Sequence, residues 1–236
     1  MLDSIVFHTL GQLATGILLF IGFVPPSKIG SGFGRFHTIL AWALWVLALW
    51  GNFSVEFYFF TGCILLAFLF SQKNIPYYSF LTLSVVLSFY LLLQGDPIRS
   101  LFWQLPAALV LGSSSVAMLL GHWYLVAPKL PIAYLKTLTI ALIAAILIRS
   151  AFLAEAFFTN QAHLKSIHFY ELYGIFFLQR IALGLLLTLA LSILTYFCVR
   201  IRSTQSATGI LYVVLVFCLV GEITGAYLFL KTGLSL

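Results

Sequence analysis

Long apolar runs separated by short polar breaks fill almost the whole of this 236-residue chain. Hydrophobic residues make up 62% of it and charged residues only 8%, whereas a soluble domain carries about 25% charged residues. A soluble core cannot hide so much apolar surface, so lipid has to be the solvent for most of it. A helix needs about 20 apolar residues to cross the ~30 Å hydrocarbon layer of a membrane. By that measure the runs predict about eight spans, over residues 4–24, 36–51, 54–72, 76–94, 100–126, 132–157, 168–199 and 208–230.

The predicted fold class is therefore all-α, a polytopic integral membrane bundle that forms one domain over residues 1–236. The breaks fall where the chain offers Pro, Gly or charge, as in PPSKIGSGFGR and RIRSTQS. The GNFS break is so short that the two spans beside it could instead be one hairpin. We interpret residues 1–95 as a four-helix scaffold half and residues 96–236 as the half that carries intramembrane charges.

Lys and Arg in the loops predict the orientation, because cytoplasmic loops are enriched in both. One set of loops holds Lys28, Arg35, Lys73, Lys129, Arg200 and Arg202. The opposite set holds Arg99, Lys165 and Lys231, together with Asp3, Glu56 and Asp96. We therefore expect the first set to be cytoplasmic and both termini to lie on the outer side, in a membrane of the bacterial inner-membrane type.

The apolar runs of the second half carry Arg149, Glu155, Glu171, Arg180 and Glu222, and of these Arg149, Arg180 and Glu222 lie deepest. A charge near the bilayer centre costs about 2.5–3.5 kcal/mol on insertion scales, so such residues mark a functional site by default. At 1.5 Å per residue, Arg149 and Glu222 lie about 25 and 20 Å from the inner ends of their spans. Arg180 lies about 15 Å below the outer surface. We predict that the three share the outer half of the bilayer, either as a working site or as a lock that fixes helix packing.

A second group of polar residues is expected above these charges, near the outer rim. It consists of His8, Glu155, His168, Glu171 and Tyr173. His168 and Glu171 are three residues apart and share a helix face, and Tyr173 shares a face with Arg180. From this group we select His8, His168, Glu171 and Tyr173 as candidates for cofactor binding, while Glu155 fits a solvated rim residue.

Other features exclude some classes of protein. The net charge of +6 rests on twelve Lys and Arg residues and does not indicate nucleic-acid binding, since the positive-inside rule explains it. The cysteines, Cys63, Cys198 and Cys218, have no CxxC spacing and no clustered His, so no metal site is predicted. Gly221 and Gly225 form a small-xxx-small pair that permits close helix approach.

The last span carries the sequence GEITGAYLF at residues 221–229. It resembles the final helix of the membrane-anchor subunits of the polysulfide reductase and dimethyl sulfoxide reductase type. The predicted topology is similar to the eight-span forms of that family, whose two ends lie outside. The family often has Arg after the second Gly, where this chain has Ala226. The resemblance implies an anchor that binds a quinol near the outer face and passes electrons to an iron–sulfur partner outside.

The leading hypothesis is thus a quinone- or quinol-binding subunit of a membrane redox complex, at most a quinol-oxidising anchor. Glu222 would take the proton released by the quinol, and an Arg or His would bond the quinone oxygen. One alternative is a b-type cytochrome, with haem between His8 and His168 or between His37 and His122. Another is a small-solute transporter, with a broken helix between Pro106 and the GSSS sequence at 112–115. The last is a noncatalytic assembly subunit.

Overall fold

The computed structural model describes residues 2–50, 53–94, 97–127 and 130–234, and every regular element in them is helical. The first elements are α1 (Leu2–Ile21), α2 (Pro26–Ile29), α3 (Ser31–Ala48), α4 (Val55–Leu69), α5 (Asn74–Leu92) and α6 (Pro97–Val126). The others are α7 (Ala133–Thr159), α8 (Gln161–Ser166), α9 (Phe169–Ile181), the π-helix η1 (Ala182–Leu187), α10 (Thr188–Arg200) and α11 (Thr204–Thr232). The predicted all-α class is confirmed.

Among the described residues, six helices are long and apolar enough to cross a membrane, as expected of an integral membrane protein. They are α1, α5, α6, α7, the continuous rod formed by α9, η1 and α10, and α11. The other two predicted spans correspond to α3, with 18 residues, and α4, with only 15. Their helices lie alongside the rest, but the count of eight spans stays a prediction.

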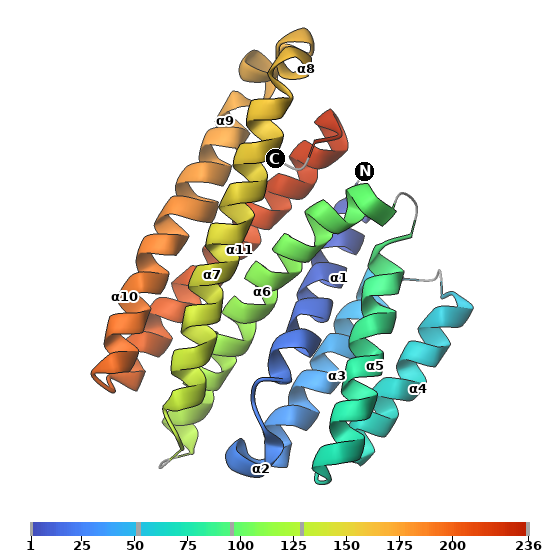
Figure 1. Ribbon diagram of the computed structural model, residues 1–236, viewed down its shortest axis with the longest axis vertical. Helices are drawn as coiled ribbons and strands as arrows, with labels where there is room; N and C mark the ends of the chain where they lie inside the picture. The colour runs from blue at the N-terminus through green and yellow to red at the C-terminus, as the bar shows by residue number, and fades with distance from the viewer. Residues whose placement is uncertain (1, 51–52, 95–96, 128–129, 235–236) are drawn as a thin grey trace.

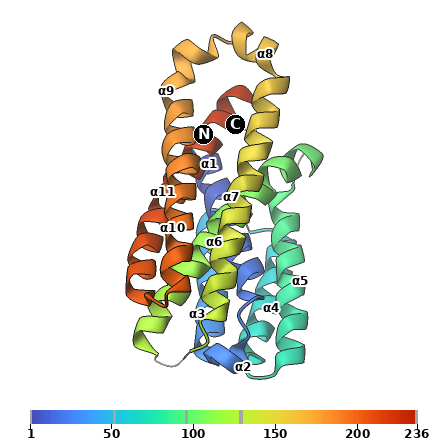
Figure 2. The same ribbon diagram turned by 60° about the vertical axis from the view of Figure 1, so that its left-hand side comes forward.

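The helices run roughly side by side, with α6 between two groups (Figure 1). The group of α1, α3, α4 and α5 lies on one side of α6, and α7, α9, α10 and α11 lie on the other (Figures 1 and 2). Both termini lie at one end of the bundle, which we call the terminal end (Figure 1). The helix ends near Lys28, Lys73 and Arg200 lie at the opposite end.

This arrangement agrees with the predicted alternation of the loops, whereas the membrane side of each end stays a prediction. Two of the charges used for that prediction, Asp96 and Lys129, lie outside the described residues.

The two groups of helices meet where α1 crosses α6. A Cβ atom added to Gly16 would lie 2.7 Å from the Cα atom of Gly112, and it would collide with the Ala108 carbonyl oxygen. Real side chains do not approach a backbone so closely. Glycine at both positions therefore lets the backbones of α1 and α6 touch, which is how small residues drive association of helices in lipid.

Helix α6 is continuous for 30 residues, although Pro106 lies inside it. The helix break that we considered between Pro106 and the serines at 113–115 is therefore wrong. The hydroxyl of Ser113 donates to the Leu109 carbonyl (2.6 Å) and that of Ser114 to the Leu111 carbonyl (3.0 Å). Such side-chain bonds satisfy the serines within their own helix, and a proline is tolerated where neighbouring helices support the freed backbone groups.

We predict that Gly112→Ala destabilises the protein by about 3 kcal/mol or more, because the new methyl group has only backbone atoms to displace. The free energy of unfolding is measured in mixed detergent micelles, with circular dichroism as the signal. Gly209→Ala is the matched control, since a Cβ atom there meets nothing within 4 Å. The control should change stability by less than about 1 kcal/mol. Equal changes in stability in the two variants would show that the backbones of α1 and α6 do not touch at Gly112.

Candidate functional site

Arg149, Arg180 and Glu222 form a single hydrogen-bonded triad at the junction of α7, α9 and α11. Arg149 donates from Nε to Oε1 of Glu222 (3.3 Å) and from Nη2 to Oε2 (3.2 Å). Arg180 donates from Nη2 to both oxygens, at 3.1 and 3.2 Å. The structure thus brings together the three charges whose depths the sequence indicated.

The triad is buried and carries an excess of positive charge. Both arginine side chains are 0% exposed and that of Glu222 is 2% exposed. Among the described residues, no other Asp, Glu, Lys or Arg is buried. Two guanidinium groups and one carboxylate leave a net charge of +1. Three of the guanidinium nitrogens, Arg149 Nη1, Arg180 Nε and Arg180 Nη1, have no hydrogen-bond partner among the described residues.

Glycines on α11 create the space for the Arg180 guanidinium. A Cβ atom on Gly225 would lie 3.0 Å from Arg180 Cζ and 3.1 Å from its Nε, and one on Gly221 would lie 3.3 Å from Nη1. Gly184 and Gly221 also meet, because a Cβ atom on Gly221 would lie 2.7 Å from the Cα atom of Gly184. The small-xxx-small pair is thus both a packing surface and a cradle for a charged side chain.

A π-helix begins two residues after Arg180 and covers Ala182–Leu187. The Thr188 hydroxyl donates to the Leu183 carbonyl, five residues earlier, at 2.7 Å. A π-turn adds a residue to the helical turn and is frequent at functional sites. Here it begins two residues after Arg180 and contains Gly184, the glycine that meets α11. The hydropathy pattern gave no signal for it, because it lies within one uninterrupted apolar run.

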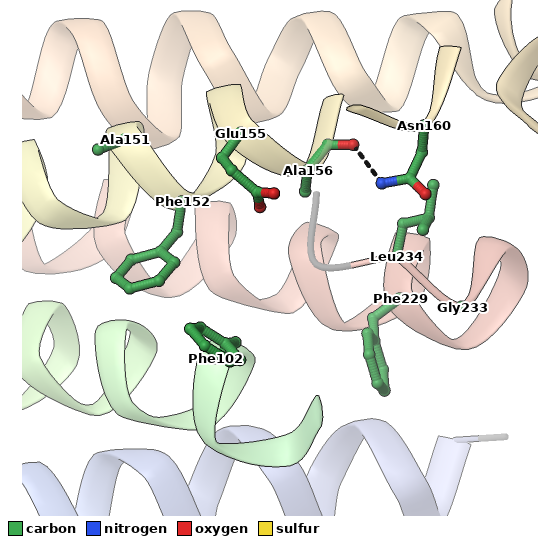
Figure 3. A pocket seen from close by; sticks show the side chains of 9 residues that line it. All are labelled: Phe102, Ala151, Phe152, Glu155, Ala156, Asn160, Phe229, Gly233 and Leu234. Atoms are coloured by element: carbon green, nitrogen blue, oxygen red, sulfur yellow. Dashed lines mark hydrogen bonds between the residues drawn. The ribbon is translucent and has the colours of Figure 1, made fainter. Parts of the chain in front are cut away.

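A groove of about 710 Å³ opens between α6, α7 and α11 at the terminal end (Figure 3). Its lining is largely aromatic and aliphatic, with the side chains of Glu155 and Asn160 as polar members; the set is Phe102, Ala151, Phe152, Glu155, Ala156, Asn160, Phe229, Gly233 and Leu234. The rings of Phe102 and Phe152 lie 5.7 Å apart across it. In Figure 3 the Glu155 carboxylate extends from α7 into the space between the helices.

The groove lies directly above the triad on shared helix faces. Phe152 follows Arg149 by three residues, which is about 4.5 Å along α7, and therefore shares its face. Phe229 follows Glu222 by seven residues, about 10 Å along α11, again on one face. The groove and the triad thus lie at successive levels of α7 and α11, and none of the three triad residues lines the groove.

The candidates for cofactor binding are dispersed. His168 and Glu171 lie at the start of α9 with side chains 71% and 79% exposed, and His168 Nδ1 lies 3.6 Å from Glu171 Oε2. Tyr173 is half-buried, with its ring 6.1 Å from that of Phe169 and 6.2 Å from that of Tyr227. His8 is on α1, on the other side of α6 (Figure 1).

His8 belongs to a buried amide network that the sequence analysis missed. Gln12 donates from Nε2 to Gln104 Oε1 (2.7 Å), and Gln104 donates from Nε2 to His8 Nδ1 (2.8 Å). Both glutamines are 0% exposed. The His8 ring lies 4.7 Å from that of Trp103, which stacks on Phe229 at 4.3 Å. The signal in the sequence was a glutamine inside each of two predicted spans, since a buried amide needs a hydrogen-bond partner just as a buried charge does.

The histidines proposed as haem ligands lie in different surroundings. The inner pair is His37, which is buried and donates from Nδ1 to the Phe33 carbonyl (2.8 Å), and His122, which is exposed and lies 3.3 Å from the Tyr212 hydroxyl. In the outer pair, His8 Nδ1 already accepts from Gln104, while His168 is solvent-exposed. Each pair therefore joins a partly or fully buried imidazole to an exposed one, whereas a haem between two helices needs both imidazoles in the core.

Comparison with family models, with curated proteins and with solved structures gave no match. The resemblance of residues 221–229 to the anchor subunits therefore stays a prediction.

The glycine cradle predicts a specific sensitivity. Gly225→Ala should destabilise the protein by about 1–3 kcal/mol, because the methyl group displaces the Arg180 guanidinium from its carboxylate partner. Thermal unfolding in detergent measures the change. Gly174→Ala, on α9, is the control because a Cβ atom there meets nothing within 4 Å. A neutral Gly225→Ala would show that Arg180 does not depend on this cradle.

The excess charge predicts an order among triad variants. Glu222→Gln leaves two buried guanidinium groups without a countercharge, and loss of one partner from a buried pair costs about 3–5 kcal/mol. Arg149→Met leaves one arginine and one carboxylate in balance. We therefore expect Glu222→Gln to be clearly less stable than Arg149→Met in the same unfolding measurement. The reverse order would show that the triad does not hold a net positive charge.

Proposed function

We propose that this chain is an integral membrane subunit, of the bacterial inner-membrane type, that binds a quinone or quinol in the groove at the terminal end. The observation that carries the proposal is a largely aromatic groove at the terminal end, on α7 and α11, the two helices that also carry Arg149 and Glu222 of the buried triad. A membrane quinone has the complementary parts, an apolar ring with carbonyl oxygens. Ligand sites of this kind are mainly apolar and contain a few polar groups that fix orientation.

The geometry favours a division of roles among the charged groups. Both oxygens of Glu222 already accept hydrogen bonds from two arginines. Glu222 is thus a poor acceptor for a proton from a quinol, although we had expected that role for it. Glu155 lines the groove, is exposed to solvent and extends into the space between the helices (Figure 3). We assign the proton exchange with outer water to Glu155, and to the triad the positioning of α7 and α11, which line the groove.

Quinone binding is tested by photolabelling with an azido-substituted short-chain quinone, followed by mapping of the labelled peptides. We expect label on α6, α7 and α11, and a decrease of at least about fivefold in Ala151→Phe, because the new ring occupies the groove. Ala133→Phe, which is exposed near the other end of α7, is the matched control. Label that is absent, or unchanged in Ala151→Phe, would reject the groove as the quinone site.

The resemblance supports a partner outside the membrane, an iron–sulfur protein that receives the electrons of the quinol. The expected result of purification in mild detergent is such a protein in fixed proportion to the chain, with its absorption and iron content. Ala151→Phe should retain the partner while losing quinone-dependent reduction of its clusters. A partner that copurifies without any quinone labelling would instead support the noncatalytic assembly role, in which the triad only locks α7, α9 and α11 together.

A further inference from the structure

Among the described residues that line the groove at the terminal end, Glu155 and Asn160 carry the polar side chains. Glu155 is exposed to solvent, and its carboxylate extends into the space between the helices (Figure 3). An ionised carboxylate accepts hydrogen bonds and donates none. An amide side chain both donates and accepts, so the polar chemistry of the groove depends on which end of the Asn160 amide is still available.

Hydrogen bonds at the end of α7 use both hydrogens of the Asn160 amide. Asn160 donates from Nδ2 to the Ala156 carbonyl (2.9 Å) and to the Thr159 hydroxyl oxygen (3.0 Å). That hydroxyl donates its own hydrogen to the Glu155 carbonyl (2.7 Å), so it can only accept from the amide. Asn160 is therefore left with Oδ1, which is an acceptor. Both polar side chains of the groove thus offer acceptors to a ligand.

The apolar walls of the groove suit both redox forms of a quinone, whereas these acceptors distinguish them. The rings of Phe102 and Phe152, 5.7 Å apart, are apolar surfaces for the ring of either form. The oxidised form carries carbonyl oxygens, which only accept, so they would face the oxygens of Glu155 and Asn160 with no hydrogen between them. The reduced form carries hydroxyl groups, which donate, and a hydrogen bond to an ionised acceptor is about twice as strong as one between neutral groups.

We propose that Glu155 and Asn160 make the groove selective for the reduced, dihydroxy form of its ligand over the oxidised form. This inference rests on the proposed function and names both the redox form that the site holds and the residues that select it. A hydroxyl group of the ligand donates to the carboxylate of Glu155 or to Oδ1 of Asn160. The triad takes no direct part in the selection, since none of its residues lines the groove.

The test is equilibrium binding of a radiolabelled short-chain quinone to the full-length chain in detergent, measured with the oxidised compound and, under anaerobic conditions, with the reduced compound. Binding that is lost in Ala151→Phe is assigned to the groove, since uptake into the detergent micelles is common to both proteins. We expect the reduced form to bind at least about tenfold more tightly, which is the effect of one hydrogen bond to a charged group. Equal binding of the two forms, or tighter binding of the oxidised form, overturns the inference while the site itself stands.

Two variants locate the selectivity. Glu155→Gln replaces a carboxylate by an amide that can also donate, so the reduced form should lose at least about fivefold in affinity while the oxidised form does not. Glu56→Gln is the matched control, because it removes a carboxylate from the first turn of α4, a helix that contributes no residue to the groove. An unchanged preference in Glu155→Gln, or equal losses in the two variants, would overturn the role of Glu155. Absence of groove binding by either form in the unmodified chain rejects the proposed function itself, so the two failures are distinguishable.

Discussion

The contact between one carboxylate and two guanidinium groups constrains the second half of this bundle more than any other interaction. In lipid, apolar side chains gain little by meeting one another, so helices associate through close packing and polar contacts. The Arg149–Glu222–Arg180 triad joins α7, α9 and α11 at one level, and each arginine reaches both carboxylate oxygens. Removing Glu222 leaves two positive charges in a medium that cannot hydrate them. The positions of these three helices are thus tied to one another.

The backbone around the triad follows from the need to accommodate large charged side chains between tightly packed helices. Gly221 and Gly225 provide room for the Arg180 guanidinium, and Gly184 lets the rod of α9 and α10 approach α11. The π-helix that contains Gly184 begins directly after Arg180 and Ile181. The glycine spacing on α11 and the π-helix after α9 therefore both serve to fit the charged triad between closely packed helices. The described part of the first half has no such triad, and α1 instead packs Gly16 against Gly112 of α6 and Gln12 against Gln104 of α6.

The sequence predicted the helical bundle well, because the apolar runs and their breaks leave few alternatives in lipid. It also predicted that Arg149, Arg180 and Glu222 share one level, since rise per residue converts position into depth. The π-helix could not be found in this way, as it changes no hydropathy. Gln12 and Gln104 were missed because neutral amides were not counted among candidate site residues. The inward-facing side of each span was also unknown, so His8 and His168 were grouped although they lie in separate parts of the bundle.

A packing lock and a binding site are not exclusive interpretations of the triad. A lock between two helices needs one positive and one negative charge, which neutralise each other and satisfy most of their hydrogen bonds. This triad joins three helices, so its second arginine also fits a lock, and among the described residues it leaves a net positive charge and three donors without partners. Buried unsatisfied donors are expensive, so they persist where another group meets them. The groove at the terminal end is lined by residues of α7 and α11, so a ligand there would contact two helices whose positions the Arg149–Glu222 ion pair fixes.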